Sequence, residues 1–172
     1  LRVERRHRLG AEPLAPRRPH LGHRHARIDL AEHGLDHVAA LVDLGNEGIG
    51  IDPGCIPGRL QGEGASKVTL IQDLYSEKYA DLPGDVVCCR HTLEHIQPTR
   101  AFMQMVRRVI GERTDTLVFL EVPDARRVLR ERAFWDVYYE HCTYLTAGSL
   151  ARLFRSTGFD LIELVRDFGD QY

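Results

Sequence analysis

The sequence has no long apolar run, no strong net charge and no C-x-x-C spacing among its four cysteines. Its apolar runs, such as those at residues 86–89 and 117–120, fall far below the roughly 20 residues that a bilayer-spanning helix requires. The 23 basic and 25 acidic side chains give a net charge of −2, which argues against a generally basic nucleic-acid binder and a disordered acidic chain. We therefore expect a soluble cytoplasmic protein with reduced thiols, and neither a membrane nor nucleic acid as its partner.

The 172 residues, of which 43% are hydrophobic, suit one globular domain, but the composition changes near residue 40. Residues 1–40 contain eight arginines, six of the nine histidines and five acidic residues, a local charge of +3 that leaves −5 for the remainder. No helix or strand period is apparent there. We interpret residues 1–38 as a basic, irregular arm, with too few apolar residues to offset its ordering entropy, and residues 39–172 as the domain. Acidic residues and prolines interrupt the arginines, which makes the arm a weak nucleic-acid-binding stripe.

From residue 46 onward, short apolar runs alternate with helical periods, as in a parallel sheet with covering helices. The pattern predicts strands at residues 48–51, 67–72, 85–90, 116–122 and 159–166. The expected fold class is α/β, a Rossmann-like and mostly parallel sheet with flanking helices, incomplete at both ends.

Two helices are expected between these strands. Apolar residues between 101 and 110 recur at the spacing of one helix face, with Pro98 suited to the first turn and Gly111 to the exit. A second helix is predicted to begin after an N-cap at Thr146 and to stop at Gly158.

Acidic residues follow the first two predicted strands, at the sheet edge where such folds bind ligands. Asp52 could accept hydrogen bonds from both hydroxyls of a ribose, although the Asp-Pro-Gly sequence at 52–54 is equally typical of a turn. Asp73 could contact an adenine amino group, and a solvated loop aspartate is the alternative.

The strand predicted at 85–90 runs into Arg90, His91 and the sequence Thr-Leu-Glu-His-Ile at 92–96. A histidine here can titrate near neutrality. The His-x-x-Glu-His order resembles an inverted zinc-protease motif, but no third ligand is evident and Leu93 and Ile96 more simply pack a short turn. We therefore assign no metal site.

Residues 134–144 concentrate the single tryptophan, three of six tyrosines, a glutamate and a histidine. Such aromatic residues can line a pocket, and Glu140 with His141 can act as an acid and base pair. The alternative is an aromatic loop that only covers the sheet.

Four segments together resemble the successive strand-end motifs of class I S-adenosylmethionine-dependent methyltransferases, namely residues 48–53, 72–75, 85–96 and 118–124. Residues 135–150, 158–159 and 168–172 are similar to the deoxysugar C-methyltransferase branch. The resemblance implies S-adenosylmethionine as the methyl donor. It also implies donor-binding residues, with Asp52 on the ribose, Asp73 and Leu74 beside the adenine, and Arg90 and His91 near the reactive end.

The same resemblance implies a small-molecule acceptor, of which a carbon in a nucleotide-linked keto-sugar is one candidate. His141 would be the base that removes a proton beside a ketone, with Glu140 and Tyr138 alongside it. A neutral imidazole suits this step because the carbon becomes nucleophilic only when deprotonated.

The sequence departs from this family in two places. The window at 27–36 holds one glycine and no preceding apolar run, so we expect the first strand and the glycine-rich loop to be missing. The chain also stops at Tyr172, before a last strand, and begins with Leu1. We expect residues 1–38 to be unrelated sequence at a fragment boundary, and a non-catalytic binding domain is the alternative function.

Overall fold

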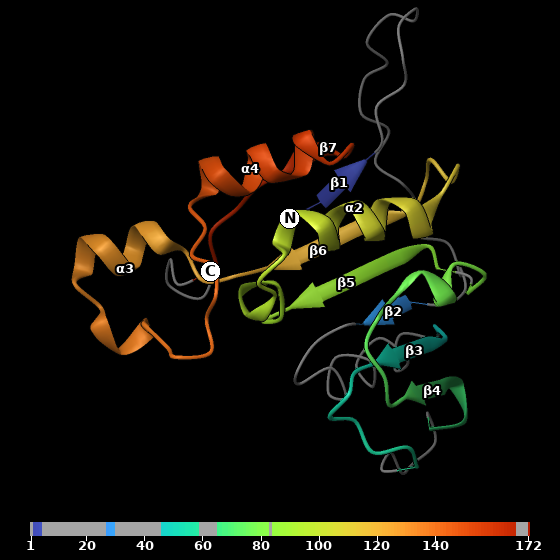
Figure 1. Cartoon of the computed structure of the whole chain (residues 1–172). Coiled ribbons are helices and arrows are strands. Elements are labelled where there is room, and N and C mark those ends of the chain that lie inside the picture. The colour runs from blue at the N-terminus through green and yellow to red at the C-terminus, as the bar shows by residue number, and fades with distance from the viewer. Residues whose placement is uncertain (1, 5–26, 30–45, 59–64, 83, 168–171) are drawn as a thin grey trace, which may run out of the picture.

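The computed structural model describes residues 2–4, 27–29, 46–58, 65–82, 84–167 and 172, with residues 2–4 and 27–29 described as backbone only. The strands described there form one sheet in the order β4-β3-β2-β5-β6-β1-β7 (Figure 1). All neighbours from β4 to β6 are parallel, whereas β1 is antiparallel to both β6 and β7. This arrangement confirms the predicted α/β fold with a mostly parallel sheet.

The five predicted strands are confirmed, with bounds that differ by up to three residues. They are β3 (Gly48–Ile51), β4 (Val68–Ile71), β5 (Val86–Arg90), β6 (Leu117–Glu121) and β7 (Asp160–Glu163).

The expectation that no strand lies in residues 1–40 is wrong at two places. The segment β2 (Arg27–Asp29) occupies the centre of the sheet, where it pairs in parallel with both β3 and β5. The segment β1 (Arg2–Glu4) lies between β6 and β7, and so supplies the partner strand that β7 was expected to lack. The boundary of the domain at residue 38 stays a prediction, because residues 5–26 and 30–45 lie outside the described residues.

The two predicted helices are confirmed as α2 (Thr99–Ile110) and α4 (Ala147–Ser156). Pro98 is the N-cap of α2 rather than a first-turn residue, and Gly111 ends the helix with a positive φ of 61° that favours glycine. In α4, the Thr146 side chain accepts a hydrogen bond from the backbone N–H of Ser149, whose hydroxyl in turn accepts from the backbone N–H of Thr146. This reciprocal capping box fixes where α4 begins.

A third helix, α3 (Ala125–Glu131), was not predicted and lies beyond the end of β6, away from the sheet (Figure 1). Single 3-10 turns add η1 (Ala65–Lys67), η2 (Glu77–Tyr79), η3 (Leu93–His95) and η4 (Phe134–Asp136). Within the described ranges, no helix is long and apolar enough to cross a bilayer.

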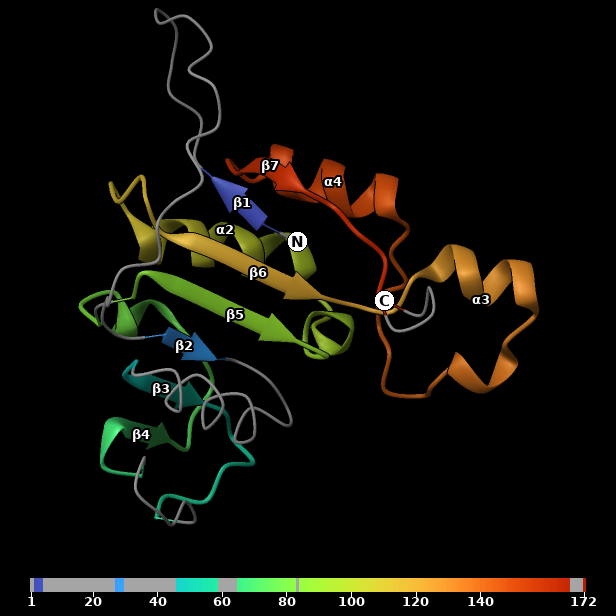
Figure 2. The ribbon, with the colours of Figure 1, turned by 180° about the vertical axis from the view of Figure 1, so that it is seen from behind.

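The core lies between one face of the central strands and the helices α2 and α4. Alternate residues of β5 and β6 are buried, so that Val87 and Cys89 face the core while Cys88 points to the other face, as the strand period requires. The helices contribute the buried side chains of Met103, Val106, Ile110, Leu150, Leu153 and Phe154. Figures 1 and 2, from opposite sides, show α2 on one side of β5 and β6.

The parallel strands β2 to β6 all end at the same edge of the sheet, which Figure 2 shows with their arrowheads pointing toward α3. Ligands of open α/β sheets bind outside this edge. The residues that follow these strands are therefore the place to look for a functional site.

Candidate functional site

Asp52 follows β3 and holds the turn after it. Its Oδ1 atom accepts a hydrogen bond from the backbone N–H of Gly54 at 2.5 Å, while its own backbone N–H donates to the carbonyl of Ile71 at 3.1 Å. The turn alternative raised by the sequence is thus present. Because a carboxylate has a second oxygen, this turn and a ribose contact can coexist.

Asp73 follows β4 and is engaged by its own loop. Its Oδ2 pairs with the Lys78 ammonium and accepts from the Tyr79 hydroxyl, and Oδ1 accepts from the backbone N–H of Leu74 at 2.8 Å. The Lys78 side chain, and then the Tyr79 hydroxyl, lower the pKa of Asp73 to about 2. The Leu74 side chain is exposed. A ligand that takes hydrogen bonds from this carboxylate must compete with these partners.

Arg90 and His91, at the end of β5, are held by one carboxylate of β6. Glu121 Oε1 accepts from Arg90 Nε at 3.0 Å and Nη2 at 2.7 Å, and lies 2.8 Å from His91 Nε2. The His91 backbone has a positive φ of 48°, which is uncommon for a residue other than glycine and is often found at functional sites. Glu121 is not among the site residues predicted from the sequence, so its role in positioning both side chains was missed.

The turn η3 is hydrogen-bonded to residues 140–143, which are about 45 residues away in the sequence. The backbone carbonyl of Glu94 accepts from the N–H groups of Cys142 at 2.7 Å and Thr143 at 3.1 Å. In return, His95 Nδ1 donates to the carbonyl of Glu140 at 3.2 Å. These hydrogen bonds place the aromatic segment directly beyond the end of β5.

His141 lies among aromatic rings as a result. Its imidazole centroid is 4.8 Å from those of His95 and Tyr138 and 5.8 Å from that of Tyr144. These contacts hold the ring at the wall of the adjacent space.

That space is a cavity of about 460 Å³, here called the imidazole pocket. It is lined by His91, Glu94, His95, Pro123, Arg127, Asp136, Tyr138, Glu140, His141 and Tyr172. The three predicted catalytic residues and His91 therefore share one pocket. Burial, and then the nearby carboxylates of Glu121 and Asp136, raise the pKa of the Tyr172 hydroxyl, so the pocket favours the neutral phenol.

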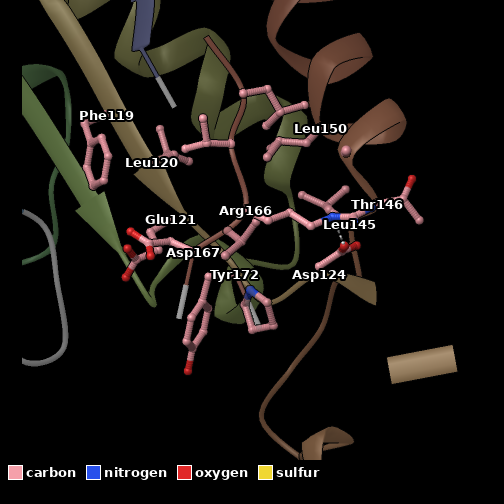
Figure 3. Close-up of a pocket in the computed structure, with 15 residues that line it drawn as sticks. Phe119, Leu120, Glu121, Asp124, Leu145, Thr146, Leu150, Arg166, Asp167 and Tyr172 are labelled. Carbon is pink, nitrogen blue, oxygen red and sulfur yellow. Dashed lines mark ion pairs between the residues drawn. The ribbon is translucent and has the colours of Figure 1, made fainter. Parts of the chain in front are cut away.

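A second cavity of about 280 Å³ lies between the end of β6, residues 145–147 and residues 164–167 (Figure 3). We call it the Arg166 pocket. Arg166 Nε is 3.1 Å from Asp124 Oδ2, and this ion pair crosses its wall in Figure 3. Pro123 and Tyr172 line both this cavity and the imidazole pocket, so the two adjoin.

A third cavity of about 370 Å³, the arginine pocket, is lined by Asp124, Arg126, Arg127, Arg130, Glu131 and Arg166. Arg127 pairs with Glu131 at 2.9 Å and with Asp136 at 2.5 Å, which neutralises its charge. Arg126 and Arg130 lie one turn apart on α3 and are exposed. Among the described residues neither has an ion-pair partner, so this pocket carries a net positive charge.

The structure brings together some predicted site residues and not others. Tyr138, Glu140, His141 and His91 share the imidazole pocket. Asp52 and Asp73 lie beside each other, because both backbone N–H groups bond to the carbonyl of Ile71, but β2 separates β3 from β5 in the sheet. The four remaining donor-site candidates are Asp52, Asp73, Leu74 and Arg90. As far as the described residues extend, they line none of these three pockets.

A common donor site for the two groups stays a prediction. Residues 30–45, which follow β2 and include most of the window where the glycine-rich loop was sought, lie outside the described residues. The structure changes one observation about metals. The sequence showed no third ligand for the His-x-x-Glu-His segment, whereas in the structure His141 lies beside both Glu94 and His95.

The model of a family described as "Methyltransferase domain" matches residues 22–164. The match begins within the segment interpreted as a basic arm and includes β2. No curated protein matches the sequence.

Proposed function

The chain belongs to the methyltransferase-domain family, which normally uses S-adenosylmethionine, and we propose that it transfers the donor's methyl group to a carbon of a small molecule. That carbon would lie next to a ketone, as in a keto-sugar of the kind that deoxysugar C-methyltransferases modify. The observation that carries this proposal is the shared pocket of Tyr138, Glu140, His141 and His91.

His141 is the proposed base. A carbon–hydrogen bond beside a ketone is cleaved when a base takes the proton and the electron pair moves toward the carbonyl oxygen. His141 would accept that proton, and the ring contacts with His95, Tyr138 and Tyr144 support a fixed imidazole position. S-adenosylmethionine supplies a methyl group already activated on a sulfonium, so positioning is the protein's main task in the transfer.

Tyr138 and Glu140 are proposed to serve the acceptor side. The Tyr138 side chain lines the pocket, and its hydroxyl is a donor suited to the developing enolate oxygen. The backbone carbonyl of Glu140 holds His95, and its side chain lines the same pocket.

The donor is proposed to lie across the carboxyl ends of β3, β4 and β5. Asp52 would bind the ribose with the carboxylate oxygen that the turn leaves available, and Asp73 and Leu74 would flank the adenine. Arg90 and His91 would border the sulfonium end, where Glu121 holds both of them.

Two exposed arginines in the adjoining arginine pocket support an acceptor that carries phosphate groups, such as a nucleotide-linked sugar.

The proposal is tested by incubating the chain with labelled S-adenosylmethionine and a nucleotide-linked keto-sugar and locating the label by mass spectrometry and NMR. Label on a carbon beside the ketone, with S-adenosylhomocysteine formed in equal amount, is the expected result. Label on oxygen or nitrogen would reject the carbon chemistry. Donor binding without any transfer would instead favour the non-catalytic binding domain.

A further inference from the structure

A group of three potential metal ligands lies at the inner wall of the imidazole pocket. Glu94, His95 and His141 each offer one donor atom, and these atoms all lie within 4.8 Å of one another. Glu94 and His95 come from η3, whereas His141 comes from the aromatic segment. The group therefore exists only because the fold joins these two parts of the chain.

The backbone holds both parts in place. The hydrogen bonds from Cys142 and Thr143 to the Glu94 carbonyl fix the distance between the segments. The Glu140 carbonyl can only accept, so His95 Nδ1 carries the proton of the hydrogen bond between them. That tautomer leaves the lone pair on Nε2, and a histidine bonded through its other nitrogen to a carbonyl is the usual arrangement of a metal-ligating imidazole.

The chemistry of the three groups matches one class of ligand. Two imidazoles and a carboxylate are a recurrent ligand set of Zn²⁺, with metal–ligand distances of about 2.0–2.2 Å and a fourth position open to water. Ligands around such an ion lie roughly 3.4 Å apart, so side-chain adjustments of about an ångström would close this group around a metal. The pocket provides the open side, and Glu94, which is 2% exposed, provides a buried carboxyl group.

We infer that Glu94, His95 and His141 form a binding site for a divalent transition metal such as zinc. Because the metal uses the imidazole of His141, the metal-bound chain does not use that imidazole as a base. The metal site is inferred from the geometry alone, whereas the exclusion between metal and base also rests on the proposed function.

Metal binding is tested on the full chain after treatment with a chelator and dialysis. Co²⁺ is titrated while its visible absorption is followed, and Zn²⁺ is titrated by calorimetry. Histidines of the arm can bind metal weakly, so the readout is the affinity of the tight site. This affinity should fall by about 100-fold or more in Glu94→Gln and in His95→Ala. The controls are Glu131→Gln on α3 and Glu163→Gln on β7, neither of which lies in the proposed ligand set.

The expected result is one Co²⁺ site with the intense absorption of a four-coordinate complex, present in the wild type and both controls and absent in the two ligand variants. Circular dichroism of the metal-free proteins establishes that the variants are folded. Equal tight binding in wild type, Glu94→Gln and His95→Ala would overturn the site, as would absence of tight binding in the wild type.

Transfer activity then tests the exclusion between metal and base separately. We expect one equivalent of Zn²⁺ to stop transfer while calorimetry still detects donor binding. Undiminished transfer by a chain that holds zinc at this site would overturn the exclusion between metal and base and leave the metal site standing. Absence of transfer in the metal-free chain would contradict the proposed function and not the site.

Discussion

The helix-covered face of the sheet and the edge beyond its strands are built from different kinds of side chain. On the covered face, Met103, Val118 and Phe154 are at most 1% exposed and pack without polar partners. Beyond the strand ends, Phe134 is 78% and Tyr139 98% exposed, and the Glu121 carboxylate holds the side chains of Arg90 and His91. The covered face supplies the free energy of folding, whereas the edge places chemically active groups at some cost in exposed apolar surface.

The largest expected effect is on the rate of transfer, at a residue of the edge whose substitution should not affect stability. His141→Gln should lower the rate of transfer by about 10²–10⁴-fold, because it removes the proposed base. Donor affinity and the melting temperature should hardly change. Steady-state kinetics, donor calorimetry and thermal melts measure the three quantities, with Tyr139→Ala as the control. Full activity in His141→Gln would eliminate the role of this residue.

The second prediction addresses the covered face. Phe154→Ala should lower the free energy of unfolding by about 3–5 kcal/mol, because it leaves a cavity between α4 and the sheet. Leu129→Ala, at an exposed position of α3, should change it by no more than about 0.5 kcal/mol. Chemical denaturation measures both. Similar losses of unfolding free energy in the two variants would mean that the exposed Leu129 stabilises the fold as much as the buried Phe154 does.

The third prediction asks whether Asp52 does more than hold a turn. Asp52→Asn keeps an oxygen that can accept from the backbone N–H of Gly54, but it removes the negative charge. If the carboxylate binds the ribose, donor affinity should fall by about tenfold or more. Calorimetry with S-adenosylmethionine gives the affinity, and Asp81→Asn is a matched surface control. An unchanged affinity would leave Asp52 with its structural role only.

The last prediction is a dependence of stability on alkaline pH. Burial raises the pKa of Tyr75 from 10.0 to about 12, which means that folding favours its neutral form. The associated stability is complete below pH 10 and is lost as the pH rises from 10 toward 12. It amounts to on the order of 2 kcal/mol.

Tyr75→Phe should weaken this part of the pH dependence, which urea titrations at pH 9 and pH 11 would measure. Within the described ranges the Tyr75 hydroxyl has no hydrogen-bond partner, so the variant should be at least as stable as the wild type at neutral pH. A decrease at neutral pH would reveal a partner for this hydroxyl.

The sequence predicts the covered face well because periodicity alone determines it. Strands β3 to β6 are apolar runs, and α2 has a continuous apolar face. By contrast, β2 contains one apolar residue, Ile28, and it is a strand because β3 and β5 hydrogen-bond to it on both sides. The same holds for β1, which is paired by β6 and β7. Such tertiary pairing leaves no local period in the sequence.

The edge was predictable in its residue types but not in its contacts. Strand ends marked Asp52, Asp73 and His91, yet nothing in their spacing indicates that loop partners engage Asp73. Neither does the spacing place His141 beside Glu94 and His95, since the contact depends on hydrogen bonds across about 45 residues. A local signal existed for α3, because Asp124 is its N-cap and accepts from the backbone N–H of Arg126 at 2.9 Å.

Calorimetric titration of the chain with S-adenosylmethionine tests the central claim most directly, that side chains at the carboxyl edge of the sheet bind a methyl donor. We expect saturable binding at one site, weakened by Asp52→Asn and preserved in His141→Gln. The absence of binding heat in a chain that circular dichroism shows to be folded would contradict the claim.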